Sequence, residues 1–160
     1  MDYEVENDSD ENMQQWFDNY MAKYFITTKI CYNTSGCWNN GDSKYMNGSN
    51  AYCNRTGIGI GNNIISFILN DGSFVIIDSY GKGSIASYFG INIDSDAGLI
   101  LYFDINGAKK PNVIGRDIFA VVWTEDGAVP AWKDKTAAQR NADCSTSGTG
   151  MACINKYLAK

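Results

Sequence analysis

The sequence predicts an α+β fold in which one long N-terminal amphipathic helix packs on an antiparallel β-sheet. In the first part of the chain, an apolar side chain recurs every three or four residues, as on one face of a helix. Further along, short β-branched and aromatic runs are separated by turn signals and not by helical patterns, as in an antiparallel meander. One helix and one sheet bury their apolar faces against each other, which favours this two-layer arrangement.

The helix is predicted over residues 9–30. Ser9 is a suitable N-cap, and Asp10 and Glu11 lie in the first turn, where the helix dipole favours acidic side chains. The apolar stripe consists of seven residues: Met13, Trp16, Phe17, Tyr20, Met21, Tyr24 and Phe25. Packing on a sheet explains this stripe fully, so we infer no cofactor role from it.

The sheet is predicted over residues 64–132. Two strands, Ile64–Leu69 and Phe74–Ser79, flank the segment Asn70-Asp71-Gly72-Ser73, and Asp-Gly is a strong hairpin signal. Three further strands are predicted at Gly98–Asp104, Asp117–Thr124 and Ala128–Trp132. No helical pattern separates these strands, so the predicted connections are hairpins.

A chain of 160 residues suits one domain with one core, so residues 1–160 are treated as a single domain. Its predicted parts are an acidic leader or linker (1–8), the helix (9–30), an irregular cysteine-containing loop (31–63), the sheet (64–132) and a C-terminal tail (133–160). The loop is rich in Asn, Gly and Ser, which disfavour regular structure. Within the tail, a short helix is predicted over Met151–Leu158.

The acidic charge of the chain is concentrated at its start. Six of the 18 acidic residues lie in the first eleven positions, which leaves 12 acids against 13 bases in the rest. No strongly cationic surface is expected, so nucleic acid is not an expected partner. The longest apolar runs, such as Ile64–Leu69, are far shorter than the ~20 residues of a transmembrane helix.

Five cysteines and the absence of histidine predict disulfides and not a zinc site. The cysteines form one cluster of three and one of two: Cys31, Cys37 and Cys53, and Cys144 and Cys153. Disulfides imply an oxidising, extracytoplasmic compartment. The odd number leaves one thiol over, and spacing does not decide which two of the first three cysteines pair.

A calcium site is one hypothesis for Asp104, Asn106 and Asp117. The run Asp-x-Asn-Gly opens like a calcium-binding loop, but an EF-hand needs Glu at its twelfth position, where this chain has Gly115. The alternative is an Asx-type turn between two strands, in which the two carboxylates accept hydrogen bonds from backbone amides and pair with Arg116. We favour the turn.

No catalytic machinery is expected. Without histidine, neither a Ser-His nor a Cys-His pair can form, and no Gly-x-Ser-x-Gly elbow occurs. The acidic pair Asp94 and Asp96 is typical of a solvated loop and is weak support for a glycosidase. The sequence therefore favours a non-enzymatic protein.

Three features together resemble one family. They are the hairpin at Asp71-Gly72-Ser73, the stretch Asp-Ile-Asn-Gly-x-Lys-x-Pro-Asn-x-x-Gly-Arg-Asp-Ile-Phe at residues 104–119, and the cysteine-bracketed tail from Cys144 to Cys153. With the N-terminal stripe, they resemble the pilin-like proteins of type II secretion systems and type IV pili that carry a prepilin-type N-terminus. The resemblance covers about residues 13–160.

The resemblance implies a structural filament subunit whose partners are other pilin or pseudopilin subunits. Such a subunit is anchored in the inner membrane before assembly, through an apolar N-terminal segment that is absent from this chain, and lies in a filament or at the cell surface afterwards. It also implies a Cys144–Cys153 disulfide around a surface loop. Because some heads of this family bind calcium, it supports the calcium hypothesis above. The alternative is a secreted, calcium-dependent module that binds carbohydrate or another surface.

Overall fold

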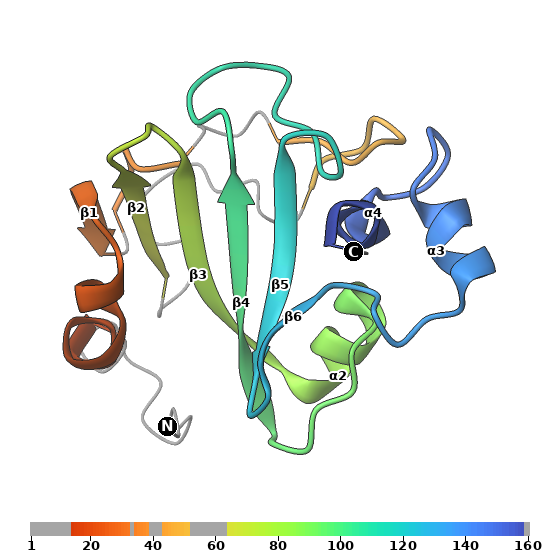
Figure 1. Ribbon diagram of the computed structural model, residues 1–160, viewed down its shortest axis with the longest axis horizontal. Coiled ribbons are helices and arrows are strands. Elements are labelled where there is room, and N and C mark those ends of the chain that lie inside the picture. Colours follow the sequence, from red (N-terminus) through yellow and green to blue (C-terminus); the bar gives the residue numbers. More distant parts are fainter. Residues whose placement is uncertain (1–13, 33, 39–42, 52–63, 159–160) are drawn as a thin grey trace.

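The computed structural model describes residues 14–32, 34–38, 43–51 and 64–158. Six strands form one antiparallel sheet in which each strand pairs with the next along the chain (Figure 1). The strands are β1 (Thr27–Tyr32), β2 (Ile65–Leu69), β3 (Phe74–Gly81), β4 (Ala97–Asp104), β5 (Ile118–Thr124) and β6 (Gly127–Pro130). The predicted hairpin at Asp71-Gly72 joins β2 to β3, and Gly72 supplies the positive φ of 89° that this turn needs.

The helices are all short. They are η2 (Phe17–Met21), η3 (Ala22–Tyr24), α2 (Lys82–Ser84), η4 (Ile85–Phe89), α3 (Ala137–Asp143), η5 (Met151–Cys153) and α4 (Ile154–Leu158). The predicted tail helix corresponds to η5 and α4, whereas the helical segments at 82–89 and 137–143 were not predicted. A capping box starts α3, because the Thr136 side chain accepts from the Gln139 amide while the Gln139 side chain accepts from the Thr136 amide.

The predicted long helix over residues 9–30, packed on the sheet, is wrong. Helical turns end at Tyr24, and β1 begins at Thr27. The reason is a β-branched stretch, Ile26-Thr27-Thr28, which favours extended backbone and pairs with β2. The part of the prediction before residue 14 lies outside the described residues.

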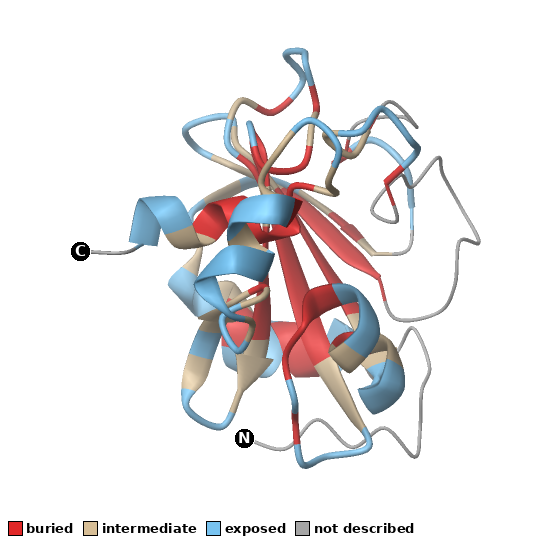
Figure 2. Ribbon diagram, turned by 90° about the vertical axis from the view of Figure 1, so that its right-hand side faces the viewer, coloured by how far each residue is buried: buried red, intermediate tan, exposed pale blue. Residues whose placement is uncertain are grey.

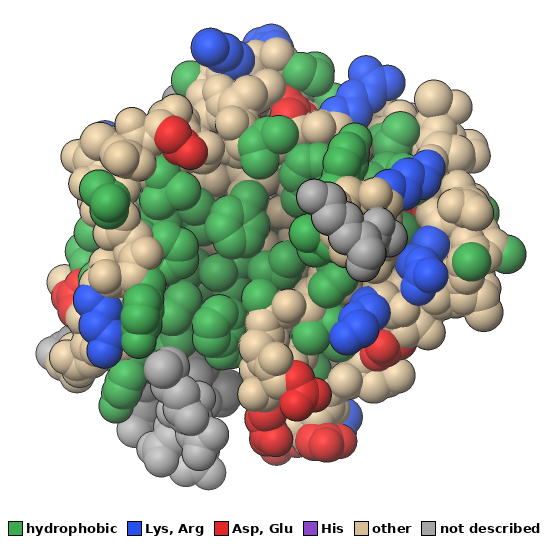
Figure 3. Space-filling view, viewed as in Figure 1, with side chains coloured by type: hydrophobic (Ala, Val, Ile, Leu, Met, Phe, Trp, Pro, Cys, Tyr) green, Lys and Arg blue, Asp and Glu red, His purple; other side chains and the backbone are tan. Residues whose placement is uncertain are grey.

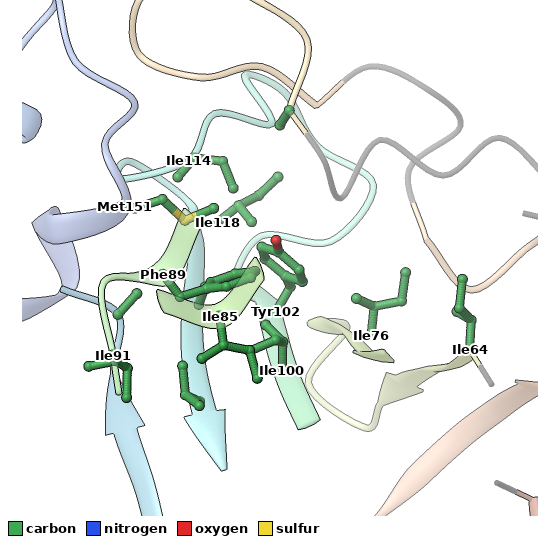
Figure 4. Close-up of a cluster of buried hydrophobic side chains, with 14 of the residues drawn as sticks. Ile64, Ile76, Ile85, Phe89, Ile91, Ile100, Tyr102, Ile114, Ile118 and Met151 are labelled. Carbon is green, nitrogen blue, oxygen red and sulfur yellow. The ribbon is translucent and has the colours of Figure 1, made fainter. Parts of the chain in front are cut away.

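Each face of the sheet carries its own hydrophobic core. Along β4, Ile100 and Tyr102 point to one face, and Leu99 and Leu101 to the other. The first face is covered by α2, η4 and loops, and its side chains interdigitate around Phe89 (Figure 4). Buried residues are therefore concentrated along the sheet, and exposed ones on the outer sides of the helices (Figure 2).

The four described cysteines form two disulfides. Cys31 at the end of β1 bonds to Cys37, and Cys144 after α3 bonds to Cys153 in η5. The second is the pairing that the resemblance implies, and the first answers a question that spacing left open. Cys53 lies outside the described residues.

Candidate functional site

The second face of the sheet carries an open apolar groove. Over β3, β4 and β5, this face has a floor of buried aliphatic side chains: Val75, Ile77, Leu99, Leu101 and Val121. Half-buried Phe103, Phe119 and Trp123 pack against this floor. Among the described residues, no helix or loop crosses the strands here (Figure 1), and a hollow of hydrophobic side chains occupies the middle of the face (Figure 3). We call this hollow the apolar groove.

One wall of the groove is the N-terminal helical segment. Phe17 of η2 is fully buried, and its ring centroid lies 5.3 Å from that of Phe67 on β2. Phe25 packs on the same ring at 4.9 Å. The wall ends in exposed apolar side chains, Tyr24 and Ile26, which are 68% and 72% exposed.

The opposite wall is α4. Ile154 is buried in the same core as the groove floor, and Tyr157 packs edge-on against Phe119 at 5.4 Å between ring centroids. Tyr157 is nevertheless 64% exposed, and Leu158 is 59% exposed. Exposed apolar side chains thus lie on both walls of the groove, and clustered exposed apolar surface marks interaction sites. The groove is therefore the candidate functional site.

One end of the groove opens into an acidic cleft of about 720 Å³. Leu99 and Trp123 line both the groove and the cleft, and Trp16 lines the cleft beside them. The polar lining includes four carboxylates and one amine: Asp94, Glu125, Asp126, Asp134 and Lys133. Acidic side chains gather at this end of the hollow in Figure 3.

The tail disulfide loop positions α4. The Asp143 carboxylate is buried and accepts hydrogen bonds from the Thr149 amide (2.9 Å), the Thr149 hydroxyl (2.6 Å) and the Ala152 amide (2.8 Å). The loop packs closely on the segment before β5, since a Cβ at Gly115 would lie 2.6 Å from the Gly150 carbonyl oxygen. Two motifs that are far apart in the sequence, residues 104–119 and the cysteine-bracketed tail, thus form one unit beside the groove.

The structure brings together the three residues of the calcium hypothesis, but in the geometry of a turn. Asp117 accepts hydrogen bonds from the amides of Val113 (2.6 Å) and Asn112 (2.8 Å) and from Asn106 Nδ2 (3.0 Å), while Asp104 Oδ1 accepts from the Asn106 amide (3.2 Å). The Oδ1 atoms of Asn106 and Asn112 are buried and accept no hydrogen bond in the described part of the chain. Calcium binds Asn carbonyl oxygens as well as carboxylates, but N–H donors already occupy both carboxylate oxygens of Asp117, which favours the turn.

The other acidic pair, Asp94 and Asp96, precedes β4 and so lies at the opposite end of that strand from Asp104. Within the described ranges, no group of three or more Cys, Asp or Glu side chains is placed to hold a metal ion. Sequence reasoning missed the groove, because it assigned these strand residues to a core covered by the long helix. It also missed Asp143, for which the one local signal is a carboxylate directly before a cysteine.

No helix in the described part of the chain combines the length and the apolar character needed to cross a membrane. Comparison of the sequence with protein-family models finds no match, and comparisons with curated proteins and with solved structures find none either.

Proposed function

We propose that this protein is the head domain of a pilin-like structural subunit of a bacterial filament, in a type II secretion system or a type IV pilus. In this role, the apolar groove receives the apolar face of a helix and so attaches the head to the filament. The observation that carries the proposal is the sheet face itself: above its buried hydrophobic floor lie three half-buried aromatic rings, Phe103, Phe119 and Trp123, which no described helix or loop crosses.

The dimensions of the groove suit one helix. Neighbouring strands lie about 4.8 Å apart, so β3 to β5 span about 10 Å. An α-helix with its side chains is also about 10 Å across. A helix laid here would cover Phe103, Phe119 and Trp123, whose rings are only half buried, and burial of large aromatic rings is strongly favourable.

The proposed location is outside the cytoplasm. Disulfides persist in oxidising compartments, and two are formed in this protein. The proposed partners are other pilin or pseudopilin subunits. The subunit is held at the inner membrane before assembly and lies in the filament or at the cell surface afterwards. The role requires no catalytic residue.

The reading frame upstream of the codon for Asp2 tests the family. We expect it to continue into a Gly-Phe junction followed by an apolar segment of about twenty residues, the length of a membrane span. A conventional cleavable signal peptide or an in-frame stop would contradict the filament role.

The role of the groove in filament assembly is tested by mutation in the bacterium that carries the gene. The double variant Tyr157→Ser/Leu158→Ser changes two side chains that are 64% and 59% exposed, so the head is expected to fold. We expect normal protein levels and loss of filaments, seen by electron microscopy. A strain that lacks the whole gene and still assembles filaments would contradict the proposal.

One observation favours a second candidate, a secreted module that binds carbohydrate or another surface. Half-buried Trp123 adjoins the carboxylates of the acidic cleft, and binding sites combine an aromatic surface with a few polar groups in this way. Calcium dependence is not part of this candidate, because the Asp117 carboxylate is engaged by N–H donors. Binding on a glycan array without calcium would support it, and an array without hits would count against it.

A further inference from the structure

The floor of the apolar groove runs directly into the acidic cleft. Leu99 and Trp123 are paired across β4 and β5, and the next pair on β5 and β6, Thr124 and Gly127, closes around the turn Glu125-Asp126. A helix in the groove that extends past Trp123 therefore meets these two carboxylates.

The residues that line the acidic cleft leave it with a net negative charge. Four acids and one lysine line it, a formal charge of −3. In the described part of the chain, none of Asp94, Glu125 and Asp126 forms an ion pair with its carboxylate, and all three are exposed. The nearby Lys82 amine donates to the backbone carbonyl of Asp94 (3.1 Å) and not to a carboxylate.

The other end of the groove has the opposite character. There, the loop between β4 and β5 exposes Lys109 and Arg116, while the carboxylates of Asp104 and Asp117 are buried and face N–H donors of the loop. The groove thus has an acidic end and a basic end along the direction of its strands. Such an arrangement favours one direction of a charged helix over the other, since like charges placed together are unfavourable.

We propose that the groove selects an amphipathic helix with an apolar stripe and a cluster of Lys or Arg at the end that lies in the acidic cleft. This rests on the proposed function and adds the direction and the charge pattern of the partner helix. The apolar stripe covers the aromatic rings, and the basic side chains pair with Glu125 and Asp126 over the Trp123 ring, where a cation also interacts with the π-system. Uniformly apolar or acidic-ended helices fit the floor but leave the carboxylates unpaired.

Two fluorescently labelled helical peptides of about twenty residues test this, one with three lysines after the stripe and one with three glutamates there. Binding to the 160-residue protein is measured by anisotropy at low and at high salt. We expect the lysine peptide to bind at least fivefold more tightly at low salt and the difference to shrink at high salt, because exposed charge pairs are screened. Equal affinities at low salt would overturn the charge selection.

Matched protein variants locate the effect. Glu125→Gln/Asp126→Asn removes two charges in the cleft, and Asp18→Asn/Asp71→Asn removes two exposed charges that do not line it. Only the first is expected to weaken the lysine peptide, by about fivefold. If both variants weaken it equally, the effect is one of net charge and the proposal fails.

A third variant distinguishes a failure of the proposed function from a failure of the charge selection. Tyr157→Ser/Leu158→Ser is expected to weaken both peptides, because it removes apolar contacts and no charge. If it weakens both while the two peptides bind equally, the groove remains the docking surface and only the charge selection is wrong. If it weakens neither, the groove is not the docking surface.

Discussion

At the residue scale, Asp117 holds the loop between β4 and β5. Its carboxylate is 5% exposed and accepts three hydrogen bonds, two from backbone amides and one from Asn106. Asp117→Ala leaves these buried donors without a partner, so we expect it to lower the free energy of unfolding by about 3 kcal/mol. Urea unfolding measures this. Asp126→Ala, at an exposed position, is the control and should change it by less than about 0.5 kcal/mol.

Thermal unfolding with added calcium tests whether the same residues bind a metal ion. If the Asp117 carboxylate serves only the turn, millimolar calcium should leave the unfolding temperature of the wild-type protein unchanged. A calcium-dependent rise that Asp117→Asn abolishes would contradict the turn and restore the metal hypothesis.

Tyr32 makes stability depend on pH in the alkaline range. Burial, together with the hydrogen bond that its hydroxyl donates to Asp18 (2.6 Å), raises the pKa of Tyr32 to about 12. The native state therefore keeps a proton that the unfolded state loses near pH 10. This contribution is fully present below pH 10 and is lost as pH rises toward 12.

The variant Tyr32→Phe isolates this group among the ten tyrosines. The difference in absorbance at 295 nm between the wild-type protein and Tyr32→Phe should report one phenol that titrates near pH 12. The variant should also lose less stability between pH 10 and pH 12. A difference titration centred near pH 10 would mean that the contact with Asp18 is not formed in solution.

At the scale of elements, the tail is held twice, by the Cys144–Cys153 disulfide and by the Asp143 carboxylate. Cys144→Ser/Cys153→Ser opens a loop of about ten residues, so we expect it to lower the free energy of unfolding by about 2.5 kcal/mol. The fold should persist because Asp143 still binds the loop. Adding Asp143→Asn to this variant should cost more than it does in the oxidised protein, and strictly additive costs would argue against a shared role.

Contact between the tail loop and the segment before β5 is tested by two glycines with similar backbone. Gly150 and Gly127 have φ of 86° and 99°, so alanine is strained at both. A Cβ at Gly150 would lie 2.3 Å from the Ile114 carbonyl oxygen, whereas one at Gly127 meets nothing within 4 Å. Gly150→Ala should therefore lower the unfolding temperature clearly more than Gly127→Ala. Similar shifts would show that the two segments are not in close contact.

At the scale of the whole molecule, the apolar groove links the binding of a helix to the stability of the fold. A helix that binds the folded head and not the unfolded chain stabilises it, by about 2.7 kcal/mol at a hundred times its dissociation constant. The lysine-ended peptide should accordingly raise the unfolding temperature of the wild-type protein, and much less that of Tyr157→Ser/Leu158→Ser. A rise of equal size in both proteins would place the peptide elsewhere.

What the sequence determined by itself is local. Continuous apolar and aromatic runs such as Leu99–Phe103 predict strands, Asp71-Gly72 predicts the turn between two of them, and Asp117 lies within reach of the amides of its own loop. These features depend on residues a few positions apart, so a local pattern suffices to identify them. Tight turns between β2 and β3 and between β5 and β6 make these pairs antiparallel. The hairpin predicted between β3 and β4 is wrong, because residues 82–96 between them contain α2 and η4.

Only the tertiary structure decided the N-terminal region and the groove. The stripe from Trp16 to Phe25 favours a helix, but Thr27 and Cys31 pair with Leu69 and Ser66, about forty residues away. Helix propensities differ by only a few tenths of a kcal/mol per residue, so a ladder of hydrogen bonds with a distant strand ends the helix at Tyr24. With that helix shortened, no helix of the described chain lies over β3, β4 and β5 between η2 and α4. No local pattern reveals the groove, because its buried floor follows the same pattern as a strand inside a core.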